Sequence, residues 1–310
     1  MAENSKIEWT THTFNGWEGC QKVGPGCDNC YAEARNLRFS GGTNWGPGAP
    51  RRRTGAANWA KPIRWNREAK AAGIRPRVFC ASLADVFDNA VDPQWRTDLF
   101  HLIHQTPHLD WLLLTKRPGN IEKMLPSYSH TQRMWPNVWL GCTVVNQEEA
   151  DRDIPKLLAV PAKVRFLSIE PMLGPINLTA LSRPAGQGVH EYSALDCDVD
   201  PADDEDWQGA TIDWVICGGE SGPHARPMHP DWARSLRDQC AAAGVAFHFK
   251  QWGEWAPDDH FSHFPDPNSD HGIHEWFDEG SDLVTGHSWR YGKKAAGRLL
   301  DGREWNEVPA

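Results

Sequence analysis

Seven short apolar runs, separated by stretches of helical periodicity, constrain the fold of this chain more than any other feature. The runs span residues 7–14, 77–82, 110–115, 138–143, 164–169, 212–217 and 245–250. Each is rich in β-branched or aromatic residues and almost continuously apolar, which is typical of buried parallel strands. Helical spacing predicts helices over 93–108, 146–160 and 230–243. We therefore predict an α/β fold, a partial or full TIM-like parallel (β/α) barrel of six to seven strands.

Polar residues gather directly after these strands. In (β/α) barrels the active site lies at the carboxyl ends of the strands, so these residues are predicted to face one cavity. The alternative is ordinary loop polarity, because every strand must end somewhere. The candidate residues are Ser82, Asp85, Lys116, Arg117, Thr143, Glu170, Gly218, Gly219 and Glu220.

Composition excludes several classes of protein. The chain has 310 residues with 17 Trp and 11 Phe, which is too aromatic for a disordered protein. No apolar run reaches about 18 residues, so no membrane partner is expected. The first residues lack the basic and apolar regions of a secretory signal, and a cytoplasmic location is expected. Eight Cys in this length do not form a disulfide scaffold.

Charge is unevenly distributed over the chain. The net charge is −9, yet residues 35–77 hold eleven Lys or Arg against one acid. Trp45, Trp59 and Trp65 lie among these cations. Cations bind phosphates and aromatic rings stack on bases, so the stretch 35–77 predicts a nucleic acid or nucleotide partner. A solvated loop, a peptide site and Trp side chains in the core are the alternatives.

Three of the cysteines form a compact motif. Cys20, Cys27 and Cys30 have the spacing C-x6-C-x2-C on a loop with glycines at 19, 24 and 26. Such a loop can hold a [4Fe–4S] cluster by three thiolates, leaving one iron open for the amine and carboxylate of S-adenosylmethionine (SAM). The alternative is structural zinc with a fourth ligand from Cys80, Cys142 or a His, although only one closely spaced pair, Cys27 and Cys30, is present. The loop follows the first predicted strand and precedes a predicted helix over 31–39, which favours the cluster.

The loop and the predicted barrel together resemble the radical SAM superfamily. The usual motif there is C-x3-C-x2-C with an aromatic residue before the last Cys, whereas here the first gap is six and Asn29 precedes Cys30. The chain more closely resembles an uncharacterised, phage-associated family with a three-cysteine motif. The matching segments are Ile7-Glu8-Trp9-Thr10, Asn15-Gly16-Trp17, Gly19-Cys20, Pro25-Gly26-Cys27-Asp28-Asn29-Cys30-Tyr31-Ala32, Ser168-Ile169-Glu170-Pro171 and Gly218-Gly219-Glu220-Ser221.

This resemblance implies a function. Cys20, Cys27 and Cys30 would ligate three irons of a [4Fe–4S] cluster, and SAM would be reductively cleaved there to a 5′-deoxyadenosyl radical. An external donor such as flavodoxin or ferredoxin would supply the electron. The substrate would be a nucleobase, nucleotide or nucleic acid, including modified phage DNA bases, in the cytoplasm of a bacterium or phage-infected host.

The resemblance also suggests roles for the strand-end residues. Lys116 or Arg117 would bind the carboxylate of SAM. Its ammonium would be bound by Asp85 or by the segment Gly218, Gly219 and Glu220. Its ribose would be bound by Ser82, Thr143 or Glu170. The candidate catalytic residues are Glu170, Lys116 and Glu220.

We expect a single domain over residues 1–310. It would carry a basic insertion at about 40–76, an acidic loop at about 183–211 and a C-terminal extension at about 252–310. His260, His263, His271 and His274 have spacing that could bind zinc, but their surroundings are typical of a surface loop. Cys80, Cys142 and Cys217 either line the cavity or are small buried side chains.

Two other classes of function compete with the radical enzyme. A zinc-stabilised nucleic-acid-binding module without catalysis would explain the cysteines but not the polar strand ends. A metal-dependent hydrolase would need His or Asp ligand pairs at those ends, which are missing.

Overall fold

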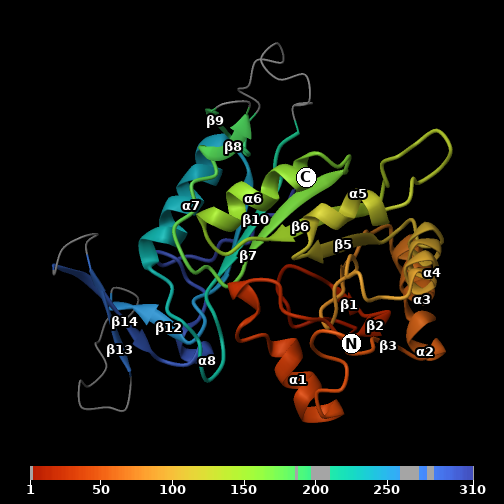
Figure 1. Cartoon of the computed structure of the whole chain (residues 1–310), viewed down its shortest axis with the longest axis horizontal. Helices are drawn as coiled ribbons and strands as arrows, with labels where there is room; N and C mark the ends of the chain where they lie inside the picture. The colour runs from red at the N-terminus through yellow and green to blue at the C-terminus, as the bar shows by residue number, and fades with distance from the viewer. Residues whose placement is uncertain (1–2, 186–187, 197–209, 259–271, 278–282, 310) are drawn as a thin grey trace. The chain divides into compact units, whose positions relative to one another are not determined.

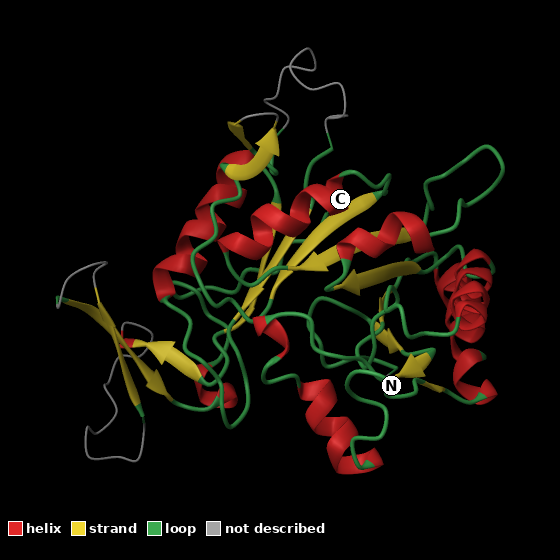
Figure 2. Ribbon diagram, in the orientation of Figure 1, coloured by secondary structure: helices red, strands yellow, loops and turns green. Residues whose placement is uncertain are grey.

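The computed structural model describes residues 3–185, 188–196, 210–258, 272–277 and 283–309 (Figures 1 and 2). Its main sheet has seven strands in the order β1-β4-β5-β6-β7-β10-β11. They are β1 (His12–Phe14), β4 (Arg77–Cys80), β5 (Asp110–Thr115), β6 (Val138–Thr143), β7 (Val164–Ile169), β10 (Trp214–Gly218) and β11 (Ala246–Gln251).

The strands follow one another across the sheet in chain order. The pairings of β1 with β4, β4 with β5, β5 with β6, and β10 with β11 are all parallel. Parallel neighbours in chain order, joined by helices, are the arrangement of a (β/α) barrel. The predicted α/β fold with a partial TIM-like barrel is therefore confirmed, with seven strands.

Continuous burial explains why the strands could be recognised. All six residues of β6 are buried, as expected for a parallel strand covered on both faces. Within β6, a side chain on Gly141 would overlap the ring of Phe166, so glycine makes room for that ring. The first strand is shorter than the predicted run 7–14, because only residues 12–14 pair with β4.

The described helices are α1 (Tyr31–Ser40), α2 (Ala56–Trp59), α3 (Lys61–Ala72), α4 (Pro93–His104), α5 (Ile121–Met124), α6 (Gln147–Leu158), α7 (Pro230–Ala243) and α8 (Lys293–Ala296). Their ends carry the expected signals. Asp92 caps α4 by accepting a hydrogen bond from the amide of Gln94 at 2.8 Å. Gly244 ends α7 in the left-handed conformation, with φ of +68°.

Two compact units make up the chain. Unit 1 comprises Met1–Thr143 and Asp153–Phe166, and unit 2 comprises Val144–Arg152 and Leu167–Ala310. Unit 1 buries Trp9, Phe14 and Trp111 in its core. Unit 2 buries Phe247 and Trp252.

Several elements lie where no regular structure was predicted. The stretch 40–76 contains α2, α3 and β3 (Arg52–Arg53), which pairs with β2 (Trp17–Glu18). The acidic stretch begins with an antiparallel hairpin of β8 (Leu181–Ala185) and β9 (Gly188–Tyr192), so its described part is not an irregular loop. Backbone pairing forms this hairpin without the apolar run that marks a buried strand.

A small sheet occupies the C-terminal extension. Its order is β12 (Trp255–Pro257), β14 (Val284–Arg290), β13 (Ile273–Phe277), and both pairings are antiparallel. His274 belongs to β13, so the prediction of a surface loop was wrong at that residue. The other three histidines of the predicted surface loop, His260, His263 and His271, lie outside the described residues. None of the described helices combines the length and apolar character needed to cross a membrane.

Candidate functional site: a cysteine loop and the polar ends of the strands

The first arm of the cysteine loop is held by backbone contacts. The amide of Gly19 donates to Leu83 O at 3.0 Å, and Cys20 O accepts from the amide of Gly46 at 2.9 Å. Gly19 has a φ of +115°, and a Cβ there would lie 2.5 Å from Asn44 O. Only glycine fits this close approach. Gly19 therefore determines where the next residue, Cys20, lies.

The second arm leads into helix α1. Pro25–Cys27 form one turn of 3-10 helix, closed by a hydrogen bond of 2.9 Å from the amide of Cys27 to Gly24 O. Cys30 is the residue that caps α1. Cys27 is buried, whereas Cys20 and Cys30 are partly exposed. The predicted loop after the first strand is therefore present, between β2 and α1.

Burial and the nearby cations shift the pKa values of Cys20 and Cys30 in opposite directions. Burial raises the pKa of Cys20 to about 11, and the carboxylate of Asp85 adds to the rise while Arg117 opposes it. Burial also raises the pKa of Cys30, and the amides of Glu33 and Ala32 together with the charge of Lys116 oppose that rise. Two cations from the end of β5 therefore favour negative charge on the loop.

This donor set fits an iron–sulfur cluster. Thiolates are the ligands of such clusters, and each thiolate of a [4Fe–4S] cluster binds a different iron. Lys116 and Arg117 offset part of the negative charge that three thiolates and a cluster would bring. Among the described residues, no three His, Cys, Asp or Glu side chains lie close enough together to hold a metal ion, so the three thiols of the loop are not gathered at one point in this structure. Cys80 and Cys142, the thiols considered for zinc, are fully buried in β4 and β6.

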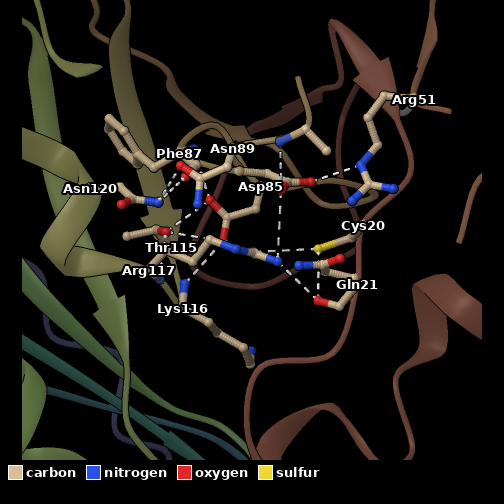
Figure 3. A network of polar contacts seen from close by, with 12 residues as sticks. Cys20, Gln21, Arg51, Asp85, Phe87, Asn89, Thr115, Lys116, Arg117 and Asn120 are labelled. Atoms are coloured by element: carbon tan, nitrogen blue, oxygen red, sulfur yellow. Dashed lines mark hydrogen bonds and ion pairs between the residues drawn. The ribbon is translucent and has the colours of Figure 1, made fainter. Parts of the chain in front are cut away.

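Asp85 and Arg117 bind each other rather than standing free (Figure 3). Arg117 Nη1 lies 2.9 Å from Asp85 Oδ2 and 3.6 Å from Cys20 Sγ, and Nη2 donates to Gln21 O at 3.0 Å. The Asp85 carboxylate also accepts from Thr115 Oγ1 at 2.8 Å. The sequence predicted both residues in the site but not their pairing.

A second buried ion pair adjoins the first. Arg51 Nε lies 2.7 Å from Asp88 Oδ2, and both side chains are 1% exposed. Asp88 Oδ1 lies 4.0 Å from Arg117 Nη2. Sequence reasoning missed Arg51 and Asp88, since Arg51 read as one of many cations in a basic stretch. Unpaired, either charge would be too costly to bury, so the pair is required by the fold.

The other candidate residues of unit 1 differ in the hydrogen bonds and ion pairs that they make. Lys116 points away from Asp85 and Arg117 in Figure 3, and its ammonium makes no hydrogen bond or ion pair with the rest of the described chain. Ser82 is fixed on both sides: its carbonyl accepts from Tyr31 Oη at 2.5 Å and its hydroxyl accepts from Asn15 Nδ2 at 3.0 Å. Thr143, the last residue of β6, is buried.

Unit 2 brings together a second group of candidates. Glu170 Oε1 lies 2.9 Å from Lys250 Nζ, with these side chains only 13% and 20% exposed. A Cβ on Gly218 would lie 2.8 Å from the same carboxylate oxygen, so glycine at this position admits Glu170. Lys250 was not among the candidate residues predicted from the sequence. A single cation near the end of an apolar strand could have indicated it.

Gly219 and Glu220 have structural partners in unit 2. A side chain on Gly219 would overlap the carbonyl of Trp252, so glycine is required where these two backbones meet. The carboxylate of Glu220 accepts from the Arg226 amide at 2.8 Å and from Arg226 Nη2 at 2.7 Å. Glu220 is thus a buried acid that is already paired.

Six of the eleven cations in the basic stretch 35–77 form ion pairs with carboxylates. Its paired cations are Arg35 and Arg52 with Glu18, Arg51 with Asp88, Arg53 with Asp98, Arg64 with Glu3, and Arg75 with Asp110. Arg38, Lys61, Arg67 and Lys70 make no ion pair with described residues. Trp65 is 2% exposed and stacks on His12, so for this Trp the core alternative is correct.

The fold and this site define the class of the protein: an α/β partial barrel with a three-cysteine loop after its first strands. The family described as "Protein of unknown function (DUF5131)" matches residues 4–309, and the chain belongs to that family.

Solved structures of spore photoproduct lyase are similar to the chain at low identity. One complexed with dinucleoside spore photoproduct has a TM-score of 0.40 and 9% identity, covering 90% of this chain and 68% of that one. A cysteine-to-serine mutant has a TM-score of 0.43 and 11% identity, with coverages of 96% and 73%. A mutant with bound AdoMet and the dinucleoside has a TM-score of 0.41 and 10% identity, covering 93% and 70%. Likenesses of this size do not assign an activity. No curated protein matches the chain.

Proposed function

We propose that this chain is a radical SAM enzyme with a [4Fe–4S] cluster on Cys20, Cys27 and Cys30. The observation that carries the proposal is the chemistry of the loop: three thiols on one short segment, with two cations from the end of β5 acting on them. When bound, the cluster and SAM supply hydrogen-atom abstraction by a carbon radical. Residues 1–310 would form the single domain that performs this chemistry.

Lys116 is the residue we assign to the carboxylate of SAM. Its ammonium has no partner within the described chain, and its charge acts on Cys30, so it lies close to the loop. Ser82 and Thr143 are proposed to contact the ribose. Asp85 and Arg117 are proposed to hold the loop in place, because each is already the other's partner.

Glu170, Gly218, Gly219 and Glu220 are the residues of unit 2 that we propose as contacts to a ligand. Glu170 is held by Lys250, and this pair can donate or accept a proton at a polar group of a ligand. Glu220 is proposed to stabilise the conformation of the segment 218–220 by its ion pair with Arg226.

A nucleobase, nucleotide or nucleic acid is the substrate class we propose, with phage DNA bases among the candidates. The support is the set of exposed cations that remain unpaired with described residues, Arg38, Arg67 and Lys70. A flavodoxin or ferredoxin of a bacterial or phage-infected cytoplasm is the proposed electron donor.

The deciding experiment is anaerobic purification followed by iron, sulfide and zinc analysis, then reduction with SAM and assay for 5′-deoxyadenosine. We expect about four irons per chain. Cys20→Ala should lose both the iron and the product. Cys240→Ala, which removes a buried thiol of α7 outside the loop, should keep both. Stoichiometric zinc without iron or product would overturn the proposal and favour a zinc-stabilised binding module.

A further inference from the structure

We propose that Arg117 is a positioning residue that ties the first arm of the cysteine loop to the end of β5. We further propose that it raises the reduction potential of a cluster held there. The second half of this inference rests on the proposed function, whereas the first half does not.

The tether consists of two contacts to adjacent loop residues. Arg117 Nη2 donates to Gln21 O at 3.0 Å, and Nη1 lies 3.6 Å from Cys20 Sγ (Figure 3). Arg117 and Cys20 are 97 residues apart in the sequence, so this is a tertiary link and not a local turn. The Arg117 side chain is 9% exposed, which keeps the link away from competing water.

Asp85, which lies outside the cysteine loop, orients the guanidinium of Arg117. Asp85 holds Nη1 at 2.9 Å. The same carboxylate accepts from the amides of Phe87 at 2.9 Å and Lys116 at 3.1 Å, and from Thr115 Oγ1. Three donors other than Arg117 thus fix the carboxylate, and the carboxylate fixes the guanidinium. The contact to Cys20 is therefore present before any ligand binds.

The chemistry of this contact has a definite direction. A cluster gains one negative charge on reduction, and an N–H donor at a thiolate sulfur stabilises the more negative state. Arg117 therefore favours the reduced cluster and raises its potential. Lysine cannot replace it fully, because only the planar fork of arginine reaches Asp85, Cys20 and Gln21 together.

The same geometry separates the roles of two neighbouring cations. The terminal nitrogens of Arg117 are engaged with Asp85, Cys20 and Gln21, whereas Lys116 points away from these groups. The sequence proposed either residue for the carboxylate of SAM. The structure assigns Arg117 to the loop and leaves that role to Lys116.

Hydrogen exchange of the protein freed of metal by chelation tests the tether. The reporters are the amides of Gly19 and Gly46, which are hydrogen-bonded on either side of Cys20. In Arg117→Met we expect both amides to exchange about tenfold faster. Arg117→Lys, which keeps the charge beside Asp85, should lie between this variant and the wild type, and it remains informative if Arg117→Met does not fold. Unchanged exchange at both amides in both variants would refute the tether.

Arg53→Met is the matched control. It removes one arginine from an ion pair with Asp98 at the surface and touches neither Cys20 nor Gln21. Its two reporter amides should exchange as in the wild type. Equal acceleration in Arg53→Met and Arg117→Met would overturn the assignment to Arg117.

A redox titration followed by electron paramagnetic resonance tests the second half. Both Arg117 variants should show a more negative cluster potential than the wild type, and Arg53→Met should not. Equal potentials in all four proteins, each loaded with iron, would overturn the redox role and leave the proposed function standing. A wild-type protein without iron would overturn the proposed function and the redox role together, while the exchange experiment would still decide the tether.

Discussion

Single atoms decide what the candidate residues can do. Asp85, Arg117 and Glu220 looked from the sequence like free polar groups at strand ends, and each is held by a partner of opposite charge. The sequence predicted these residue types and their location, because polar side chains that follow apolar runs can be recognised in the sequence alone. Their pairing was not visible, because the contact of Asp85 with Arg117 depends on the fold and Arg226, the partner of Glu220, is marked by no pattern. The buried Arg51–Asp88 contact was also missed, because it joins residues far apart in the chain.

Gly219 gives a prediction at this scale. Gly219→Ala would force the new methyl group against the carbonyl of Trp252, and neither backbone can give way easily. We expect a loss of about 1–3 kcal/mol in the free energy of unfolding, measured by urea denaturation. Gly286→Ala in β14 is the control, because nothing lies within 4 Å of the position its Cβ would take. A loss as large in the control as in Gly219→Ala would show that crowding is not the cause.

Elements were predictable where burial is continuous. The runs 110–115, 138–143 and 164–169 coincide with β5, β6 and β7, and 230–243 coincides with α7. Helix α3 was missed, because its buried side chains Trp65 and Ala69 are hidden among cations that dominate the local composition. The two-residue strands β2 and β3 are too short to show a period.

The packing of β1 against α3 gives a prediction at the scale of elements. The rings of His12 and Trp65 stack at 4.3 Å and 14°. Burial lowers the pKa of His12, so protonation favours the unfolded chain. Stability from this histidine is fully present above about pH 6.5 and is lost as the pH falls towards its folded pKa.

His12→Phe keeps a ring against Trp65 and removes the titration. Urea denaturation should be measured from about pH 7.5 to about pH 5. The free energy of unfolding should fall less steeply with falling pH in His12→Phe than in the wild type. Identical slopes for the two proteins would contradict an acid-sensitive β1–α3 contact.

On the scale of the whole molecule, the number of cations in a segment differs from the number that are free to bind a ligand. The net +10 of residues 35–77 predicts a strong anion site, yet most of these cations are bound to carboxylates. Arg67 and Lys70 on α3 are exposed and have no ion pair with described residues. The sequence could not separate the two kinds of cation, because pairing depends on acids supplied by distant segments.

DNA binding should therefore depend on the exposed pair. We expect Arg67→Gln/Lys70→Gln to reduce the salt dependence of binding to a single-stranded oligonucleotide by about 0.7 in log–log slope per lost phosphate contact. Fluorescence anisotropy over a salt series measures this slope. Arg53→Gln/Arg75→Gln, which removes two cations already bound to Asp98 and Asp110, should leave it nearly unchanged. Absence of binding by the wild type would remove nucleic acid polymers from the substrate class.

Cys30 has two places in the structure, as the third thiol of the loop and as the residue before the first turn of α1. A helix of this length depends on packing for its order, and α1 buries only Ala32 and Asn36. Whatever fixes the thiol of Cys30 therefore also fixes the direction in which α1 leaves the loop. The side chains of Leu37 and Phe39, further along the same helix, are exposed. One residue of the cysteine motif therefore also marks the start of α1, so a change at Cys30 affects the loop and the beginning of the helix together.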